Sequence, residues 1–283
     1  MILVTGATGK IGTALVEQLQ VRKTPFRALA HSKTSYERLT AQGVDALRVA
    51  DLKRADPAAF AEVDRLFLLT PGGPEQADLE RSFIDLARQA GVRRVVKLSA
   101  FGADDESVSL LGPHRESEAY IRASGLEYTF LRPNLFMQNL AALDAPLIKQ
   151  QRAIFNSAGD GKISFIDVRD VAATAVAALC GEEHSGQTLE LTGREALSYG
   201  DVAQKLSEQL EHPVRYVPLD DEAYREALVT AGLSAWYAGG LVDLYRFYRE
   251  GKAATVNDAL ERATGRAAGT MDAYLTDNRS AFV

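Results

Sequence analysis

The stretch Gly6-Ala7-Thr8-Gly9-Lys10-Ile11-Gly12 decides the fold of this chain. It follows an apolar run at residues 2–4 and opens an amphipathic stretch at residues 10–22, which predicts a strand, a glycine turn and a helix. In such a turn the glycines let the backbone bend, approach a pyrophosphate and pack on the strand, and the helix N-terminus offers N–H groups to the phosphates. The alternative is a tight strand-to-helix turn that binds no ligand. If the loop does bind a dinucleotide, we expect the cofactor to contact Gly6, Thr8, Gly9, Lys10, Ile11 and Gly12.

Short apolar runs and helical patterns alternate through the first half of the chain. Strands are expected at residues 26–30, 46–50, 65–69, 92–99 and 126–131, and helices at residues 75–90 and 113–123. Strands separated by helices pair in parallel through right-handed crossovers. The pattern therefore predicts an α/β fold with a doubly wound, parallel, Rossmann-type sheet covered by helices on both faces.

Beyond Pro133 this alternation weakens. Short strands are expected at residues 187–191 and 214–217, beside longer helices at 199–209, 220–231 and 236–248. We therefore expect a smaller, mostly helical C-terminal domain that binds substrate over the carboxyl edge of the sheet. The expected dinucleotide-binding domain is residues 1–133, rejoined by about 152–185, and the expected substrate-binding domain is residues 134–151 and 186–283.

The composition argues against several classes of function. The 283 residues include 32 basic and 38 acidic side chains without a basic block, so no nucleic-acid partner is expected. One cysteine, Cys180, and four scattered histidines have no metal-ligand spacing, so no metal site is expected. No apolar run approaches the ~20 residues of a membrane span, and a first strand at residue 2 leaves no room for a signal peptide. We therefore expect a cytoplasmic protein without membrane contact.

In dinucleotide-binding folds of this kind, the residues at the end of the second strand distinguish NAD from NADP. An acidic residue there would bind the ribose hydroxyls of NAD, whereas this chain has His31, Ser32 and Lys33. Two potential cations and a hydroxyl suit the 2′-phosphate of NADP. NADP is therefore favoured and NAD stays open; for Ser32 and Lys33 a solvated loop is the alternative.

Two later strand ends supply further candidates for the adenosine side. Asp51 is placed to accept a hydrogen bond from the adenine amino group, with Leu52 against the ring. An ordinary helix N-cap explains Asp51 equally well. Thr70 and Pro71, after the fourth strand, are expected to border the same side of the cofactor.

A short-chain dehydrogenase would carry a serine at the end of the fifth strand and Tyr-x-x-x-Lys on the next helix. Ser99 suits the first position, and we expect it beside the cofactor. The tyrosine and lysine positions hold His114 and Glu118, which share one helix face. His114 can exchange a proton near neutral pH, and Glu118 can orient it or contact the ribose. The alternative is that His114 and Glu118 form a surface i, i+4 contact that stabilises the helix by a few tenths of a kcal/mol.

The segment after the sixth strand is expected to meet the nicotinamide and the acceptor. Pro133 shapes the turn, and the backbone beside it can meet the carboxamide. The apolar side chains here suit a flat substrate, with Asn139 as a polar group acting on it. Plain packing is the alternative, chiefly for the methionine. The expected substrate contacts are Phe101, Asn134, Phe136 and Met137.

Together these stretches resemble the NmrA-like atypical short-chain dehydrogenase/reductase family. The resemblance lies in the glycine loop and in residues 96–100, 125–133, 136–139 and 167–172. Residues 191–217 and 263–266 resemble the branch with bacterial NAD(P)H:quinone oxidoreductases and triphenylmethane reductases. The resemblance implies two domains, an NAD(P) site and, in many members, hydride transfer to conjugated acceptors. That branch commonly lacks Tyr-x-x-x-Lys, as this chain does, whereas His31 stands where many relatives carry arginine.

We therefore expect an NAD(P)H-dependent reductase of quinone-like or other conjugated aromatic acceptors, acting as a monomer or homodimer. Hydride would pass directly from the nicotinamide, with Ser99, His114 and Asn139 as candidates to orient or protonate the acceptor. Two alternatives stay open. One is a non-catalytic dinucleotide sensor that binds a protein partner, and the other is an aromatic polyketide tailoring enzyme using the same site.

Overall fold

A parallel sheet forms the centre of the larger of two lobes. The computed structural model describes residues 1–49 and 57–283, and within these residues the sheet has seven strands in the order β3-β2-β1-β4-β5-β6-β8. Strands β1 to β3 follow one another toward one edge of the sheet, and β4, β5, β6 and β8 follow one another toward the other edge. The direction in which strands are added therefore reverses between β1 and β4. The strands are β1 (Ile2–Val4), β2 (Phe26–Ala30), β3 (Asp45–Arg48), β4 (Arg65–Leu68), β5 (Arg94–Leu98), β6 (Glu127–Pro133) and β8 (Gln187–Leu191).

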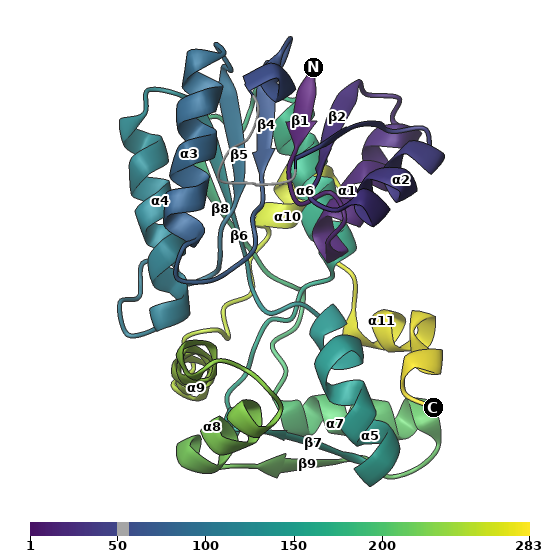
Figure 1. Cartoon of the computed structure of the whole chain (residues 1–283). Coiled ribbons are helices and arrows are strands. Elements are labelled where there is room, and N and C mark those ends of the chain that lie inside the picture. Colours follow the sequence, from purple (N-terminus) through teal and green to yellow (C-terminus); the bar gives the residue numbers. More distant parts are fainter. Residues whose placement is uncertain (50–56) are drawn as a thin grey trace.

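Helices cover both faces of this sheet, as Figure 1 shows. One face carries α1 (Lys10–Val21), α2 (Lys33–Ala41), α6 (Val168–Cys180) and α10 (Ala259–Thr264), and the other carries α3 (Gln76–Gln89) and α4 (Gly112–Ala123). Every residue of β5 is buried, as a strand covered on both faces requires. The doubly wound parallel fold predicted from the sequence is confirmed. Within the described ranges, no helix has the length and apolar character needed to cross a membrane.

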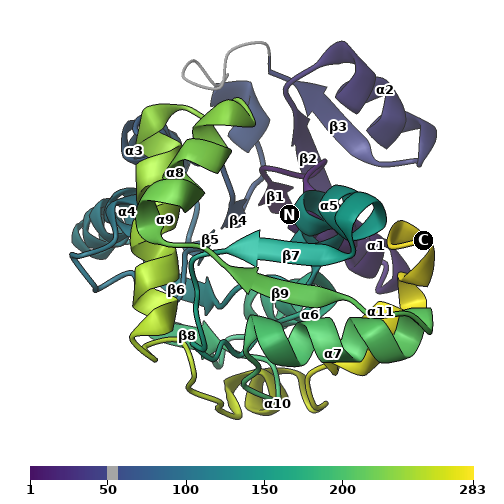
Figure 2. The same cartoon turned by 90° about the horizontal axis from the view of Figure 1, so that it is seen from below.

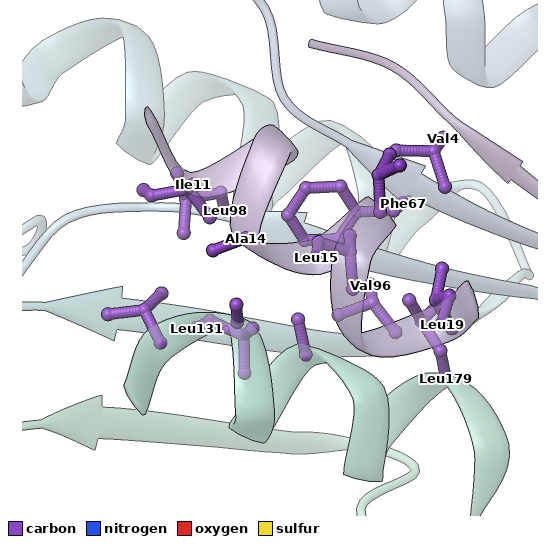
Figure 3. Close-up of a cluster of buried hydrophobic side chains, with 14 of the residues drawn as sticks. Val4, Ile11, Ala14, Leu15, Leu19, Phe67, Val96, Leu98, Leu131 and Leu179 are labelled. Atoms are coloured by element: carbon purple, nitrogen blue, oxygen red, sulfur yellow. The ribbon is translucent and has the colours of Figure 1, made fainter. Parts of the chain in front are cut away.

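The apolar face of α1 explains where the first helix packs. Ile11, Leu15 and Leu19 recur at four-residue spacing and are buried. Figure 3 shows them in one apolar cluster with Phe67 of β4 and Leu179 of α6. This packing holds the N-terminus of α1, and the glycine loop before it, at the carboxyl edge of the sheet.

A smaller lobe lies beyond the carboxyl ends of the strands (Figures 1 and 2). It is built on a two-stranded parallel sheet of β7 and β9. Aromatic rings are frequent in its core, so it has an apolar centre of its own. Its elements are η4 (Leu140–Asp144), α5 (Ala145–Gln151), β7 (Ala153–Asn156), α7 (Tyr199–Leu210), β9 (Arg215–Pro218), α8 (Asp221–Thr230), α9 (Ala235–Arg249) and α11 (Met271–Asp277).

Two strands pair differently from the expected division of the chain. The sequence pattern assigns residues 187–191 to the smaller lobe, but β8 pairs with β6 in the large sheet. The pattern also returns residues 152–185 to the large sheet, but the first strand of that range, β7, pairs with β9. Both differences have one cause, since the sheet that a short strand joins depends on partners distant in sequence.

The sixth strand is longer than expected. It continues to Pro133, although proline lacks the N–H that a strand interior donates. Pro133 is the last residue of β6, and its carbonyl oxygen accepts a hydrogen bond from the N–H of Phe101 at 3.0 Å. The proline therefore ends the strand without leaving its acceptor unpaired.

Candidate functional site

The glycine loop has the shape that a bound pyrophosphate needs. Gly6 has a positive φ of 64°, and a Cβ there would lie 2.8 Å from the carbonyl oxygen of Leu69. A Cβ on Gly12 would lie 2.0 Å from the carbonyl oxygen of Gly6. Gly9 is the N-cap of α1 and has no side chain to occupy the N–H groups of the first turn. These residues fit the anionic bridge of a dinucleotide.

Thr5 attaches this loop to the neighbouring strand. Its buried hydroxyl oxygen lies 3.1 and 2.9 Å from the carbonyl oxygens of Phe67 and Leu69, to either of which it can donate its one hydrogen, and it accepts from the N–H of Leu69 at 2.8 Å. The loop therefore begins at a fixed position between β1 and β4. This is the point where the strand order reverses, which is the usual ligand site of such sheets.

The end of β2 presents the residues expected to select the dinucleotide. His31, Ser32 and Lys33 are all exposed. The Ser32 hydroxyl accepts from the N–H of Ser35 at 3.0 Å and so caps α2. The Lys33 Nζ lies 3.6 Å from Glu37 Oε1, in a contact that leaves both side chains mostly in solvent. The two basic side chains remain available to an anionic group.

Arg38 is a further cation at the glycine loop, and the sequence analysis missed it. Its Nη2 donates to the carbonyl oxygen of Thr8 at 3.1 Å, and the residue is exposed. A guanidinium has five N–H donors, so this one contact leaves others for a phosphate. The only local signal was an exposed arginine in the helix that follows β2.

Four other residues were candidates for the adenosine side. Pro71 is exposed, whereas Thr70 is buried and its hydroxyl donates to Glu80 Oε1 at 2.9 Å. Thr70 therefore fixes the loop after β4 to α3. Asp51 and Leu52 lie outside the described residues.

A buried ion pair, also missed by the sequence analysis, lies between the sheet and α3. The side chains of Lys97 and Glu80 are 0% and 1% exposed, and Lys97 Nζ lies 2.6 Å from Glu80 Oε2. Burial would raise the pKa of Glu80, but the charge of Lys97 and hydrogen bonds outweigh it and lower that pKa. Gln76 also donates to Glu80, at 3.2 Å. A carboxylate is thus kept ionised beneath the loop after β4.

His114 belongs to this network and does not titrate near neutral pH. Its Nδ1 lies 3.3 Å from Gln76 Nε2 and 3.5 Å from Lys97 Nζ. Withdrawal of the ring from water, followed by the charge of Lys97, lowers the pKa of His114 to about 3. The imidazole is therefore neutral at pH 7, and the expectation that it exchanges a proton near neutral pH is wrong.

Ser99 and Glu118 are bonded to each other inside the protein. The Ser99 hydroxyl donates to Glu118 Oε1 at 2.6 Å, and Arg132 donates to both oxygens of Glu118, at 2.9 and 2.6 Å. Arg122 adds a donor at 3.1 Å. Glu118 is only 1% exposed, so it is no surface residue, and its oxygens are occupied by these donors. The carboxylate therefore joins α4 to β5 and β6.

Most of the expected substrate contacts are buried. Asn134 donates to Ser164 Oγ at 2.8 Å and thereby joins two loops. Met137 and Phe101 belong to the apolar core of the smaller lobe. Phe136 is half-buried. Burial favours the packing interpretation for the first three residues and leaves Phe136 as the stronger candidate for contact with a ligand.

Lys10 connects the glycine loop with the segment that enters the smaller lobe. Its Nζ donates to Asn139 Oδ1 at 3.3 Å and to the carbonyl oxygen of Gln138 at 3.5 Å. The Gln138 side chain accepts from the N–H of Val168 at 3.0 Å and so helps to cap α6. The structure thus brings together Lys10 and Asn139, which the sequence analysis assigned to the cofactor and to the acceptor.

The residues selected from the sequence therefore fall into two groups. Those exposed or half-buried are Gly6, Thr8, Gly9, Lys10, His31, Ser32, Lys33, Pro71, His114, Phe136 and Asn139. Those buried are Ile11, Gly12, Thr70, Ser99, Phe101, Glu118, Pro133, Asn134 and Met137. In the part of the chain that the structure describes, no group of three or more His, Cys, Asp or Glu side chains is arranged to hold a metal ion.

The chain is similar to known proteins over nearly its whole length. The model of the NmrA-like family matches residues 1–275. The NAD(P)H azoreductase of Xenophilus azovorans is 36% identical over 285 residues, which cover 100% of this chain and 99% of that protein. The similarity therefore includes both lobes.

Two solved structures share this arrangement. The NADPH-dependent quinone oxidoreductase of Escherichia coli in complex with NADPH has a TM-score of 0.88 at 28% identity, covering 98% of this chain and 99% of that one. The triphenylmethane reductase of Citrobacter sp. in complex with NADP(H) has a TM-score of 0.84 at 26% identity, covering 96% and 98%. In both cases the match extends across the glycine loop and the smaller lobe.

Proposed function

Since this chain belongs to the NmrA-like family, we propose that it is an NAD(P)H-dependent reductase of azo, quinone-like or other conjugated aromatic acceptors. The observation that carries the proposal is the glycine loop, in which a Cβ at Gly12 would collide with the backbone of Gly6. The end-to-end similarity to an azoreductase supports the class of acceptor. A cytoplasmic location and a monomeric or homodimeric state stay predictions.

The chain's own residues would bind and orient the reactants. The backbone of the glycine loop would hold the pyrophosphate, and Arg38, His31 and Lys33 would favour the 2′-phosphate of NADP. The reduced nicotinamide, when bound, supplies the hydride. Phe136 and Asn139 would hold an acceptor against it and limit access of water.

The helix that carries a tyrosine and a lysine in other short-chain dehydrogenases has no free acid here. His114 is neutral at pH 7 and hydrogen-bonded within a network, and Glu118 is occupied by Arg132 and Ser99. A cationic dye needs only the hydride, which suits such a site. An azo compound needs a proton as well, and α4 does not supply it.

We expect the purified protein to oxidise NADPH only when an azo dye, a quinone or a triarylmethane dye is also present. The measurement is the absorbance of the reduced nicotinamide, with NADPH and NADH in turn. Reactions without protein and without acceptor are the controls. No oxidation with any acceptor, together with NADPH binding by calorimetry, would favour the dinucleotide sensor over the reductase.

Replacing Arg38 by glutamine is expected to weaken NADPH binding at least tenfold and to leave NADH binding unchanged. A hydrogen bond to a charged group contributes about 1.5–3 kcal/mol, and about 1.4 kcal/mol is tenfold in affinity. Calorimetry with both dinucleotides measures the ratio. Arg22→Gln, at the exposed far end of α1, is the matched control. If Arg38→Gln lowers the affinities for NADPH and NADH equally, Arg38 does not bind the 2′-phosphate.

A further inference from the structure

The hydrogen bonds around His114 determine which of its two ring nitrogens carries the proton. Two groups approach Nδ1, Gln76 Nε2 at 3.3 Å and Lys97 Nζ at 3.5 Å. A lysine ammonium has only donors, and the Gln76 amide nitrogen also donates to Glu80 Oε1 at 3.2 Å, which fixes its orientation. Since both neighbours are donors, Nδ1 accepts. In the neutral imidazole the proton is then on Nε2.

The two donors beside Nδ1 have a hydrogen for each of their acceptors. The Lys97 ammonium has three, for Glu80 Oε2 at 2.6 Å, the carbonyl oxygen of Leu98 at 3.1 Å and Nδ1. The Gln76 amide nitrogen has two, for Glu80 Oε1 and Nδ1. A proton on Nδ1 would make two donors face a third one inside the protein, which is costly. The network therefore selects the Nε2–H form.

The other ring nitrogen, Nε2, is open to a ligand. Among the described residues it has no hydrogen-bond partner, and it is not one of the buried polar atoms left unpaired. His114 is half-buried, whereas Ser117 and Glu118, one turn further along the same face of α4, are buried. Helix side chains lean toward the helix N-terminus, so the open edge of the ring faces the end of α4 at the carboxyl edge of the sheet.

This end of α4 lies where the two lobes meet. The short helix before it, η3 (Ser109–Leu111), is bonded to α9 of the smaller lobe, because Ser109 Oγ donates to Asp243 Oδ2 at 3.0 Å. A Cβ on Gly240 of α9 would lie 2.4 Å from Leu110 Cγ, so the two helices are in close contact. Figure 1 shows α9 directly below α3 and α4. The open edge of the imidazole therefore faces the junction of the lobes.

A short chain of contacts connects this network to the glycine loop. Gln76 and Thr70 both donate to Glu80 Oε1, at 3.2 and 2.9 Å. The residue before Thr70 is Leu69, whose Cγ would lie 2.6 Å from a Cβ on Gly6. The loop after β4 therefore contacts the glycine loop on one side and the network on the other. Ligands of such sheets bind at this edge, outside the carboxyl ends of the strands.

We propose that His114 donates a hydrogen bond from Nε2 to the oxygen of a quinone-like acceptor that becomes negatively charged as hydride arrives, a role that rests on the proposed reductase function. In a para-quinone, one oxygen takes the hydride and forms an O–H bond, while NADPH is oxidised to NADP⁺. The π electrons shift through the ring, and the opposite oxygen becomes a phenolate. This oxyanion takes a proton from water, which leaves hydroxide, and hydroquinone is the product. His114 keeps its own proton and acts as a fixed donor that stabilises the developing charge.

The first test compares acceptors that do and do not become negatively charged. Benzoquinone develops an oxyanion, whereas a triarylmethane cation becomes neutral on accepting hydride. The measurement is the single-turnover rate at which protein-bound NADPH is oxidised by each acceptor at saturation. For His114→Phe we expect the ratio of the benzoquinone rate to the dye rate to fall by about tenfold or more, as for the loss of one oxyanion donor. His114→Gln keeps an N–H donor at the end of its side chain and should retain most of the ratio.

His184→Phe is the matched control. His184 is also half-buried, but it lies just before β8, at the amino end of the sheet, and its carbonyl oxygen accepts from Thr129 Oγ1 at 2.8 Å. The same exchange of an imidazole for a phenyl ring should there leave the ratio of the two rates at the wild-type value. Circular dichroism establishes that each variant is folded.

A second measurement examines the imidazole without turnover. Nitrogen-15 NMR of histidine side chains distinguishes the Nε2–H form, the Nδ1–H form and the cation, and the signal of His114 is the one absent from His114→Gln. Burial and the charge of Lys97 lower the pKa of His114 to about 3, against the opposing charge of Glu80. We therefore expect the Nε2–H pattern, unchanged from pH 5 to pH 8. This measurement does not require His114→Phe to fold.

The outcomes separate this inference from the proposed function. If the wild type reduces neither acceptor, the reductase function fails, and this role of His114 fails with it. If the wild type reduces both acceptors and His114→Phe leaves the ratio of the rates unchanged, the role of His114 is overturned while the reductase function stands. A proton on Nδ1, or a titration of His114 between pH 5 and pH 8, overturns it as well.

Discussion

Gly12→Val is expected to weaken NADPH binding about a hundredfold or more, a loss of ~2.7 kcal/mol. The Cβ alone would lie 2.0 Å from the carbonyl oxygen of Gly6 and 2.7 Å from the Cα of Ala7. Both are backbone atoms, so a change of side-chain rotamer cannot relieve the clash. The helix α1 must therefore move away from the loop. The N–H groups of its first turn then no longer meet the pyrophosphate. Calorimetric titration with NADPH measures the loss.

The matched control is Gly239→Ala in α9, where a Cβ would meet no atom within 4 Å. This variant should bind NADPH as the wild type does. Circular dichroism and thermal melting establish whether Gly12→Val is folded. A folded Gly12→Val protein with wild-type affinity for NADPH would contradict the dinucleotide site assigned to this loop.

Lys97→Met is expected to destabilise the protein by about 3–5 kcal/mol, because it leaves the Glu80 carboxylate buried without its cation. The melting temperature should fall on the order of 10 °C. The loss should increase with pH, since the pKa of Glu80 rises once the charge of Lys97 is gone and ionisation then costs stability. Thermal melting between pH 5 and pH 8 measures both effects.

Two further variants identify the cause of that loss. Glu80→Gln added to Lys97→Met removes the unpaired charge and should restore part of the stability, a non-additive result. Arg262→Met breaks the exposed pair with Asp258 and should cost less than about 1 kcal/mol. If Lys97→Met costs no more than Arg262→Met, the buried pair is not the stabilising interaction inferred here.

The dinucleotide-binding half could be predicted because its signals are local. The close contacts that require glycine at position 12 involve residues 6 and 7. The apolar spacing of Ile11, Leu15 and Leu19 lies within one helix, and each of the first five strands contains at least two consecutive apolar residues. Such signals reach at most a few turns along the chain, and a single sequence displays them directly.

The roles of the polar residues on α4 could not be predicted in this way. His114 and Glu118 are four residues apart and suggest one pair, yet they join different networks. His114 lies beside Lys97, 17 residues away, whereas Glu118 binds Arg132, 14 residues away. Spacing along a helix shows which residues share a face, but it does not show which buried side chains reach that face from neighbouring strands.

The sequence by itself therefore determined the fold class, the position of the glycine loop and the family of this protein. Only the tertiary structure decided that β8 joins the large sheet and that Glu80 is paired with Lys97. The physical reason is that strand pairing and the protonation of a carboxyl group depend on burial and on partners from distant segments. Both are set only when the chain has folded.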